Sequence, residues 1–280
     1  MKKNEEYLLK AYKNKYAIPQ FNINNLEWTK WILEECQEQN SPVIIGVSTG
    51  AAKYMGGYKV VVALVRSLID DLKITIPVII HLDHAKTIED CKSAYEAGFD
   101  SIMIDASAEE IEENIKKTNE VTAFAYDTLI EAEIGKIGGA EDSAEEKLVY
   151  TTASESQYFI GKTNIDMLAP SLGSVHGIYK GEPNINFEIM QEINESIQKP
   201  LVLHGGSGLS VSILQKGIQN GICKINFNTE LQLAWNDAIR KFVTENTEVY
   251  DPRKIIEAGE NALKNIVRER IEWLGSKNRG

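Results

Sequence analysis

Eight short apolar segments, each followed by a stretch with helical periodicity, succeed one another along the 280 residues of this chain. Each segment is rich in branched side chains, as in strands that are buried on both faces of a parallel sheet. The expected strands are Tyr16–Asn22, Pro42–Val47, Ile76–His81, Ser101–Asp105, Thr128–Ile134, Met167–Leu172, Pro200–His204 and Cys223–Phe227. Eight alternating strands and helices in a chain of this length predict an α/β fold, a (β/α)8 TIM barrel that forms a single domain over residues 1–280.

An open, doubly wound sheet is the competing interpretation of the same alternation. It is disfavoured because the turn after the first expected strand lacks the Gly-x-Gly-x-x-Gly pattern of dinucleotide-binding folds. No linker of low complexity divides the chain, and no repeat of 20 to 50 residues is visible.

Charge and cysteine usage narrow the classes of partner and compartment. The formal net charge is −11 and the pI is about 5.0, which argues against a nucleic acid or an anionic membrane as partner. A small anionic substrate stays possible, since a local site can oppose the overall charge. Three widely spaced cysteines, Cys36, Cys91 and Cys223, fit reduced thiols better than disulfides. With no run of eighteen apolar residues, we expect a cytoplasmic protein that does not span a membrane.

Polar residues gather where the expected strands end, which is the catalytic face of a barrel. His84, His176 and His204 each follow a different strand, so the sequence predicts a zinc-type site of three imidazoles with one position open. Three independent, hydrogen-bonded histidines are the alternative. We expect His81 to be an interior polar residue that orients its neighbours.

Carboxylates accompany these histidines. Asp83 stands beside an expected ligand and fits a proton carrier better than a ligand. Asp105 and Glu133 would be costly inside a closed core unless a cation or hydrogen-bond donors meet them. They could fix the ligand imidazoles, or form a second, weaker metal position.

Glycine-rich and amide-rich turns after the last two expected strands point to a phosphate. Gly205-Gly206-Ser207-Gly208 and Asn226-Phe227-Asn228-Thr229 stand where barrels commonly hold phosphate, and Lys180 could add charge. Ordinary tight turns capped by Ser207 and Thr229 are the alternative. Arg253 stands at the expected start of the last helix, where it could bind a second phosphate. A surface salt bridge is the alternative explanation.

At this point the residues resemble a known family, the class II, metal-dependent fructose-bisphosphate and tagatose-bisphosphate aldolases. The resemblance runs from about Tyr16 to the end of the chain. It is carried by Gln20-Phe21-Asn22, His81-Leu82-Asp83-His84, Met103-Ile104-Asp105-Ala106-Ser107, Glu131-Ala132-Glu133-Ile134-Gly135, Gly173-Ser174-Val175-His176-Gly177, Leu203-His204-Gly205-Gly206 and Tyr250-Asp251-Pro252-Arg253.

The resemblance implies reversible cleavage of fructose 1,6-bisphosphate to dihydroxyacetone phosphate and glyceraldehyde 3-phosphate, a step of glycolysis and gluconeogenesis. It implies that His84, His176 and His204 bind Zn²⁺, that Asp83 is the acid/base at the carbon 4 hydroxyl, and that Glu141 abstracts a proton. Glu133 would lie near the metal. It also implies a monovalent cation, Na⁺ or K⁺, and a homodimer or higher homo-oligomer. The implied dihydroxyacetone-phosphate cradle is Gly177, Lys180, Gly205, Ser207, Asn226, Asn228 and Thr229, and the implied residues around the other end of the sugar are Asn22, Ser48 and Arg253.

Two segments depart from the bacterial members of this family. Ala85-Lys86-Thr87 stands where they often carry Gly-Ser-Ser, and Ala108-Glu109-Glu110-Ile111 where they often carry His-His-Pro-Phe. The alternatives are therefore a tagatose-bisphosphate aldolase or a 6-phospho-5-dehydro-2-deoxygluconate aldolase, which keep the same core.

Three other classes of function fit these residues less well. A non-catalytic sugar-phosphate-binding barrel would not need Asp83 and Glu141, and a zinc-dependent hydrolase would not need the phosphate-binding turns. A Schiff-base aldolase would need a buried lysine at a strand end, whereas Lys224 lies early in its expected strand.

Overall fold

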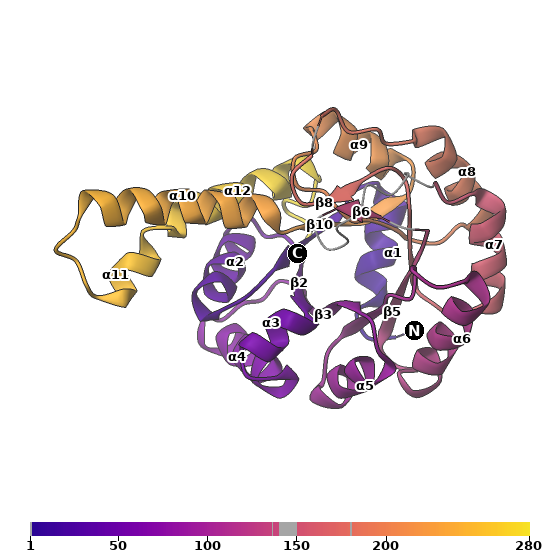
Figure 1. Cartoon of the computed structure of the whole chain (residues 1–280), viewed down its shortest axis with the longest axis horizontal. Coiled ribbons are helices and arrows are strands. Elements are labelled where there is room, and N and C mark those ends of the chain that lie inside the picture. The colour runs from indigo at the N-terminus through magenta and orange to yellow at the C-terminus, as the bar shows by residue number, and fades with distance from the viewer. Residues whose placement is uncertain (1, 136, 140–149, 180) are drawn as a thin grey trace.

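A computed structural model describes residues 2–135, 137–139, 150–179 and 181–280. Eight parallel strands close into a barrel in the order β1-β10-β9-β7-β5-β4-β3-β2, surrounded by helices (Figure 1). The strands are β1 (Ile18–Asn22), β2 (Val43–Ser48), β3 (Val78–Ala85), β4 (Ser101–Ile104), β5 (Leu129–Ile134), β7 (Met167–Pro170), β9 (Leu201–Leu203) and β10 (Ile222–Phe227). The predicted barrel and all eight predicted strands are confirmed, with ends that differ by a few residues.

Successive side chains of each strand point alternately into the barrel and toward the surrounding helices, so both faces of the strand are buried. In β2, Ile44 points into an apolar cluster inside the barrel, whereas Ile45 and Val47 belong to the larger cluster between the barrel and its helices. Helix α1 (Glu5–Asn14) adds Leu8 and Ala11 to the inner cluster and covers the end of the barrel where the strands begin. The opposite end, where the strands stop, is left for polar side chains.

Polar side chains cap several of the remaining helices at their first turn. Thr87 caps its helix by accepting a hydrogen bond from the backbone N–H of Asp90. Thr152 and Glu155 form a capping box at the start of another helix. The helices are α2 (Leu26–Glu38), α3 (Thr49–Tyr54), α4 (Tyr58–Asp71), α5 (Ile88–Ala97), α6 (Ile111–Phe124), α7 (Ala153–Lys162), α8 (Phe187–Ile197), α9 (Val211–Gln219), α10 (Thr229–Glu245), α11 (Pro252–Glu257) and α12 (Glu260–Trp273).

Two features of the helices differ from the sequence-based prediction. Helix α3 was not predicted; it is one short helix that follows β2 directly, and the Ser48 side chain caps it. The segment at Tyr250 was expected to open the last helix, but this prediction was wrong. It opens the six-residue helix α11, and the last helix starts only at Glu260, after Gly259.

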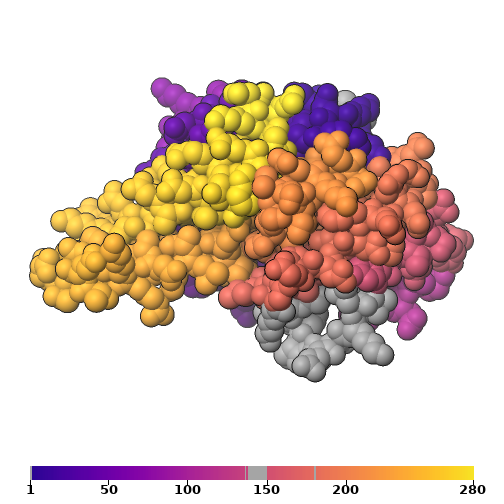
Figure 2. All heavy atoms as spheres, turned by 90° about the horizontal axis from the view of Figure 1, so that it is seen from above, coloured from indigo at the N-terminus to yellow at the C-terminus, as the bar shows by residue number. Residues whose placement is uncertain are grey.

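Helices α10, α11 and the start of α12 form a helical arm that extends away from the barrel in both views (Figures 1 and 2). Only Leu231 is buried in α10, and no residue of α11 is buried. The arm carries exposed apolar side chains, including Leu233, Val243 and Tyr250. This part of the chain therefore has little core of its own.

A second, two-stranded sheet lies beside the barrel. Its strands are β6 (Gly138–Gly139) and β8 (Val175–His176), with Gly139 paired to His176. The sheet joins the segment after β5 to the segment after β7, and so fixes the backbone on which His176 stands. None of the described helices is both long and apolar enough to cross a lipid bilayer.

Candidate metal and substrate site

The inside of the barrel changes from apolar to polar toward the ends of the strands. The inner apolar residues of β1, β3 and β5 are Ile18, Ile79 and Leu129. Two residues later the same strands present Gln20, His81 and Glu131, all fully buried, and two residues later still Asn22, Asp83 and Glu133. The strand period of two thus stacks one buried polar layer beneath a second one at the mouth of the barrel.

The three predicted imidazoles meet at this mouth. The ring centroids of His84 and His204 are 4.4 Å apart, those of His84 and His176 are 4.9 Å apart, and those of His176 and His204 are 5.8 Å apart. One nitrogen from each ring lies within 4.8 Å of the others. His84 reaches the group because it adopts a positive φ of 52° and the register of β3 with β4 shifts between Leu82 and Ala85. The chain therefore turns at His84, and this turn brings its ring to the other two.

The donor set fits a divalent metal ion. Nε2 of His84 and Nδ1 of His204 face each other at 2.7 Å, and Nε2 of His176 is buried without a hydrogen-bond partner in the described structure. Burial, with the neighbouring imidazoles, lowers the pKa of His176 to about 3, and it lowers the pKa of His204 from its usual value. Both rings are therefore neutral, the form that binds a metal.

His84 is the exception in its charge. Burial lowers its pKa, but Asp83, Asp105 and Glu133 raise it more, and the balance brings it to about 10. The carboxylates thus place a positive charge at this ring when no metal ion is bound. A divalent ion would satisfy the same carboxylates and release the proton.

Asp83 is held firmly beside the imidazoles. Nδ2 of Asn22 donates to one of its oxygens at 2.8 Å, and Nδ2 of Asn226 donates to the other at 3.2 Å. Burial favours the neutral acid, but the positive charges of His84 and Lys224 help to lower the pKa of Asp83 well below its usual range. Asp83 is therefore ionised and held in one orientation, which is the protonation state that a general base needs.

Glu131 supports His204 from the buried layer below. Oε1 of Glu131 lies 2.9 Å from Nε2 of His204, and Oε2 lies 2.6 Å from Nζ of Lys224, with all three side chains fully buried. A carboxylate at Nε2 leaves Nδ1 of His204 to face the imidazole group. Because Lys224 is committed to this ion pair, it is poorly placed to act as a Schiff-base nucleophile.

His81 has the interior role predicted for it. Its Nδ1 lies 2.8 Å from Oγ of Ser101, and its Nε2 lies 3.5 Å from Nζ of Lys224. Burial is the main cause that lowers the pKa of His81 to about 3. A neutral His81 therefore completes the hydrogen bonding beneath the site and does not join the three imidazoles.

A cavity of about 560 Å³ opens directly above these side chains. Lining residues that the sequence predicted are Asn22, Ser48, Asp83, His84, His176, Gly177, Gly205, Ser207, Asn226, Asn228 and Thr229. Asn24, Thr49, Gly50, Lys86 and Gln232 also line it and were not predicted. The backbone N–H of Asn228 donates to Oγ of Ser207 at 3.2 Å, which joins the two turns that were expected to hold a phosphate.

Six predicted site residues do not line this cavity. His204, Asp105 and Glu133 lie buried beneath its lining, in contact with or close to His84. Glu141 and Lys180 lie outside the described residues. Arg253 lies on the helical arm, where its exposed guanidinium pairs with Asp251 at 2.8 Å. Within one chain, Arg253 is therefore separate from the other residues of the site.

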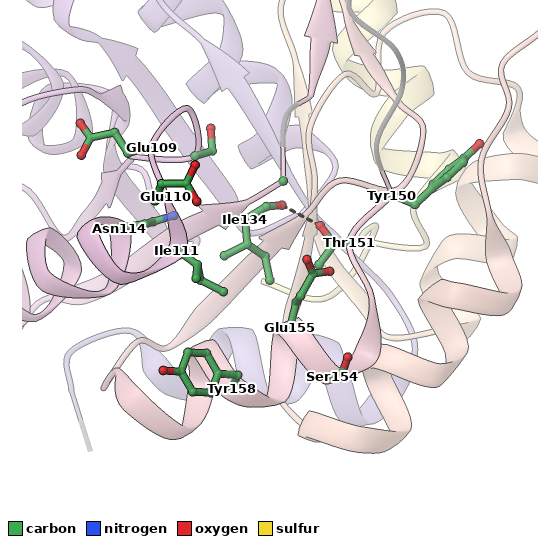
Figure 3. Close-up of a pocket in the computed structure, with 12 residues that line it drawn as sticks. Glu109, Glu110, Ile111, Asn114, Ile134, Tyr150, Thr151, Ser154, Glu155 and Tyr158 are labelled. Atoms are coloured by element: carbon green, nitrogen blue, oxygen red, sulfur yellow. Dashed lines mark hydrogen bonds between the residues drawn. The ribbon is translucent and has the colours of Figure 1, made fainter.

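A second cavity, of about 450 Å³, lies between the starts of α6 and α7 and the end of β5 (Figure 3). Thr151 donates from its hydroxyl to the carbonyl of Ile134 at 2.8 Å on its floor. Glu109, Glu110 and Glu155 line it, and none of its described lining residues is basic. This chemistry does not suit a phosphate, so the first cavity is the better candidate for a phosphorylated substrate.

Comparison with known proteins adds independent support. The model of the family "Fructose-bisphosphate aldolase class-II" matches residues 2–279. The chain is 49% identical over 278 residues to a fructose-bisphosphate aldolase of Staphylococcus epidermidis, which covers 98% of this chain and 97% of that protein. The chain belongs to the class II fructose-bisphosphate aldolase family.

Other members of the class II fructose-bisphosphate aldolase family agree in sequence and fold. A fructose-bisphosphate aldolase of Geobacillus stearothermophilus is 48% identical over the same coverage. The crystal structure of the YdjI aldolase of Escherichia coli K12 superposes with a TM-score of 0.86 at 32% identity, covering 98% of this chain and 97% of that one. Members of this family are generally metal-dependent, and two groups of side chains here could hold an ion: the three histidines, and His84 with Asp105 and Glu133.

Proposed function

We propose that this chain is a class II aldolase that reversibly cleaves fructose 1,6-bisphosphate to dihydroxyacetone phosphate and glyceraldehyde 3-phosphate. The observation that carries the proposal is the meeting of three imidazoles beside the restrained carboxylate of Asp83 at the mouth of the barrel. Full-length similarity to fructose-bisphosphate aldolases supports the same activity.

His84, His176 and His204 would hold the metal ion, which we propose to be Zn²⁺. Three neutral imidazoles with a fourth position open are the usual ligand set of catalytic zinc. When bound, the ion supplies a Lewis acid that stabilises the negative charge that bond cleavage leaves on the substrate oxygens. Glu131 and Asp105 would hold the rings of His204 and His84 in place.

Asp83 would act as the base in cleavage by taking the proton of the carbon 4 hydroxyl. Its two amide donors hold it in one orientation without using up its basicity, since an ionised carboxylate can accept about four hydrogen bonds. Glu141 would exchange the proton at the carbon of the triose fragment that the broken bond leaves behind. Proton transfer by positioned groups of this kind contributes roughly a hundredfold or more to the rate.

The phosphate of dihydroxyacetone phosphate would lie against the turns after β7, β9 and β10. Backbone amides of such turns and the N-terminus of a following helix favour an anion. The proposed contacts are Gly177, Lys180, Gly205, Ser207, Asn226, Asn228 and Thr229, and a monovalent cation, Na⁺ or K⁺, would share this region.

The other end of the sugar bisphosphate would meet Asn22 and Ser48. We also assign Arg253 to this end, supplied by the helical arm of a second copy in a homodimer or higher homo-oligomer. The exposed apolar side chains of the arm and the exposed guanidinium of Arg253 support this assignment.

A cleavage assay tests the proposal directly. Purified protein is incubated with fructose 1,6-bisphosphate or with tagatose 1,6-bisphosphate, and the triose phosphates are followed by mass spectrometry, with and without a chelator. We expect triose phosphates from the fructose epimer at the higher kcat/KM, and loss of turnover after the metal is removed. A higher kcat/KM for the tagatose epimer would show that the chain is a tagatose-bisphosphate aldolase. Binding without turnover would make it a sugar-phosphate-binding barrel.

A further inference from the structure

A second group of possible metal ligands shares His84 with the first group. Ligand atoms of His84, Asp105 and Glu133 lie within 4.8 Å of one another. Oε2 of Glu133 is buried without a hydrogen-bond partner in the described structure, and it lies 4.0 Å from Nδ1 of His84. Burying an ionised carboxylate in this way is costly unless a cation is near. Without a cation, burial and the neighbouring Asp105 raise the pKa of Glu133 to about 8, so a cation at this position would stabilise the ionised form.

The structure places a lysine ammonium at this position. Nζ of Lys86 lies 2.6 Å from Oδ2 of Asp105. Lys86 follows directly on β3, two residues after His84, and it lines the same cavity as His84 and His176. Lys86 also belongs to the Ala85-Lys86-Thr87 segment, which the proposed aldolase activity leaves unexplained.

Hydrogen bonds occupy Asp105 fully. Its Oδ1 accepts from the backbone N–H of Ser107 at 3.2 Å and from the Ser107 hydroxyl at 2.7 Å, and its Oδ2 meets Lys86 and Nδ1 of His84 at 2.7 Å. A carboxylate has about four such acceptor positions. A second metal ion would have to displace Lys86, and it would also have to separate Asp105 from the ring that Asp105 orients.

Charge balance leads to the same conclusion. Four buried carboxylates surround the imidazoles: Asp83, Asp105, Glu131 and Glu133. Lys224 pairs with Glu131 and Lys86 pairs with Asp105. With one divalent ion bound, His84 neutral and Glu133 ionised, the two carboxylates that remain match the charge of that ion. A second ion would therefore leave the site with an excess of positive charge.

We infer that the ammonium group of Lys86 takes the place of a second divalent cation, so that this chain holds a single metal ion at the mouth of the barrel. The inference rests on the proposed function, because it assumes that the three histidines bind the first ion. Lys86 acts here as a positioning residue: it holds Asp105, which in turn holds the ring of His84.

Metal stoichiometry tests the inference without reference to activity. Chelator-stripped protein is dialysed to equilibrium against increasing Zn²⁺, and bound zinc per chain is measured by elemental analysis. The variants are Lys86→Met, which removes the charge, Lys86→Arg, which keeps it, and Lys116→Met as a matched control. Lys116 also pairs with a carboxylate, Glu113 at 2.9 Å, but on an exposed part of α6.

We expect the parent, Lys86→Arg and Lys116→Met to bind one ion per chain with high affinity. Lys86→Met should bind a second ion at roughly a tenfold lower zinc concentration than the parent needs, because removing a charge near a divalent ion changes its binding by at least this much. A single-ion isotherm for Lys86→Met identical to that of the parent would overturn the inference, as would two ions of equal affinity on the parent. If no protein bound even a first ion, the proposed function would fail as well, so the two failures are distinguishable.

Discussion

At the scale of single residues, the proposed chemistry depends most on Asp83. It is buried, it accepts from Asn22 and Asn226, and it stands one residue before a proposed metal ligand. Its neighbours lower its pKa, so it is ionised before the substrate arrives. The ionised carboxylate of Asp83 can accept a proton from an alcohol, and it is not part of the apolar core that stabilises the fold.

Replacing Asp83 separates this role from metal binding. In Asp83→Asn the shape of the side chain is kept and its basicity is lost, so kcat for fructose bisphosphate cleavage should fall by about a hundredfold or more. Zinc content should stay at the level of the parent. The control is Asp90→Asn, which changes a carboxylate in the first turn of α5 that accepts from the hydroxyls of Tyr58 and Thr87. Turnover of Asp83→Asn within a few-fold of the parent would show that another group takes the proton.

The residue types of the site could be predicted from the sequence because their chemistry is specific. Histidines and an aspartate after apolar strands have few purely structural explanations, and His84, His176 and His204 do meet in space. Lys86 could not be assigned in this way. A lysine next to a ligand is most often a surface residue, and only the contact with Asp105 gives it a role.

At the scale of elements, the strands could be predicted because each one is buried on both sides and so is apolar along most of its length. Short elements could not. Helix α3 has only six residues and a single cap, and the two-residue strands β6 and β8 carry no periodic pattern. The break between α11 and α12 depends on Gly259, where a side chain would collide with Trp235. Such a contact between distant segments leaves no local signal.

Tyr179 joins the two segments that carry His176 and His204. Its hydroxyl accepts from the backbone N–H of Val175 at 3.2 Å and donates to the carbonyl of Gly205 at 2.8 Å. The two backbones are already in close contact, because a Cβ atom on Gly205 would lie 2.2 Å from the carbonyl oxygen of Val175. The spacing of two proposed metal ligands thus depends on one hydroxyl group.

Tyr179→Phe should therefore weaken metal binding. Removing an outer partner of a metal site costs about tenfold or more in affinity, so we expect the Zn²⁺ dissociation constant to rise by roughly this factor in competition with a chelator. Tyr58→Phe is the matched control, since it removes a tyrosine hydroxyl that bonds to Asp90 at 2.7 Å between α4 and α5. Equal zinc affinity in Tyr179→Phe and the parent would mean that the segments keep their spacing without the hydroxyl.

At the scale of the whole molecule, the helical arm is the part that the barrel does not explain. It extends from the barrel in both views, buries little, and carries Arg253 away from the cavity (Figures 1 and 2). The sequence predicted neither the break between α11 and α12 nor the direction of the arm. An amphipathic pattern does not say whether its partner is the same chain or another copy. The family resemblance grouped Arg253 with the substrate, and one chain alone does not bring them together.

Mixing two inactive variants tests whether Arg253 acts on a neighbouring copy. Asp83→Asn and Arg253→Ala should each be impaired, the second mainly through a higher KM. After subunits are exchanged in an equal mixture, a hybrid dimer has one site with both an intact Asp83 and an Arg253 from its partner. Roughly a quarter of the parent activity should then return for random exchange in a twofold dimer. Activity no greater than the average of the two variants would show that Arg253 does not act at the site of the neighbouring copy.

The central claim is that three imidazoles from β3, β8 and the end of β9 share one divalent ion at the mouth of the barrel. A crystal grown with Zn²⁺ and measured at the zinc absorption edge tests it most directly. We predict one anomalous peak per chain, about 2.0 to 2.1 Å from one nitrogen each of His84, His176 and His204. Loaded crystals with no peak there, or with zinc bound only by other residues, would contradict the claim and the aldolase mechanism built on it.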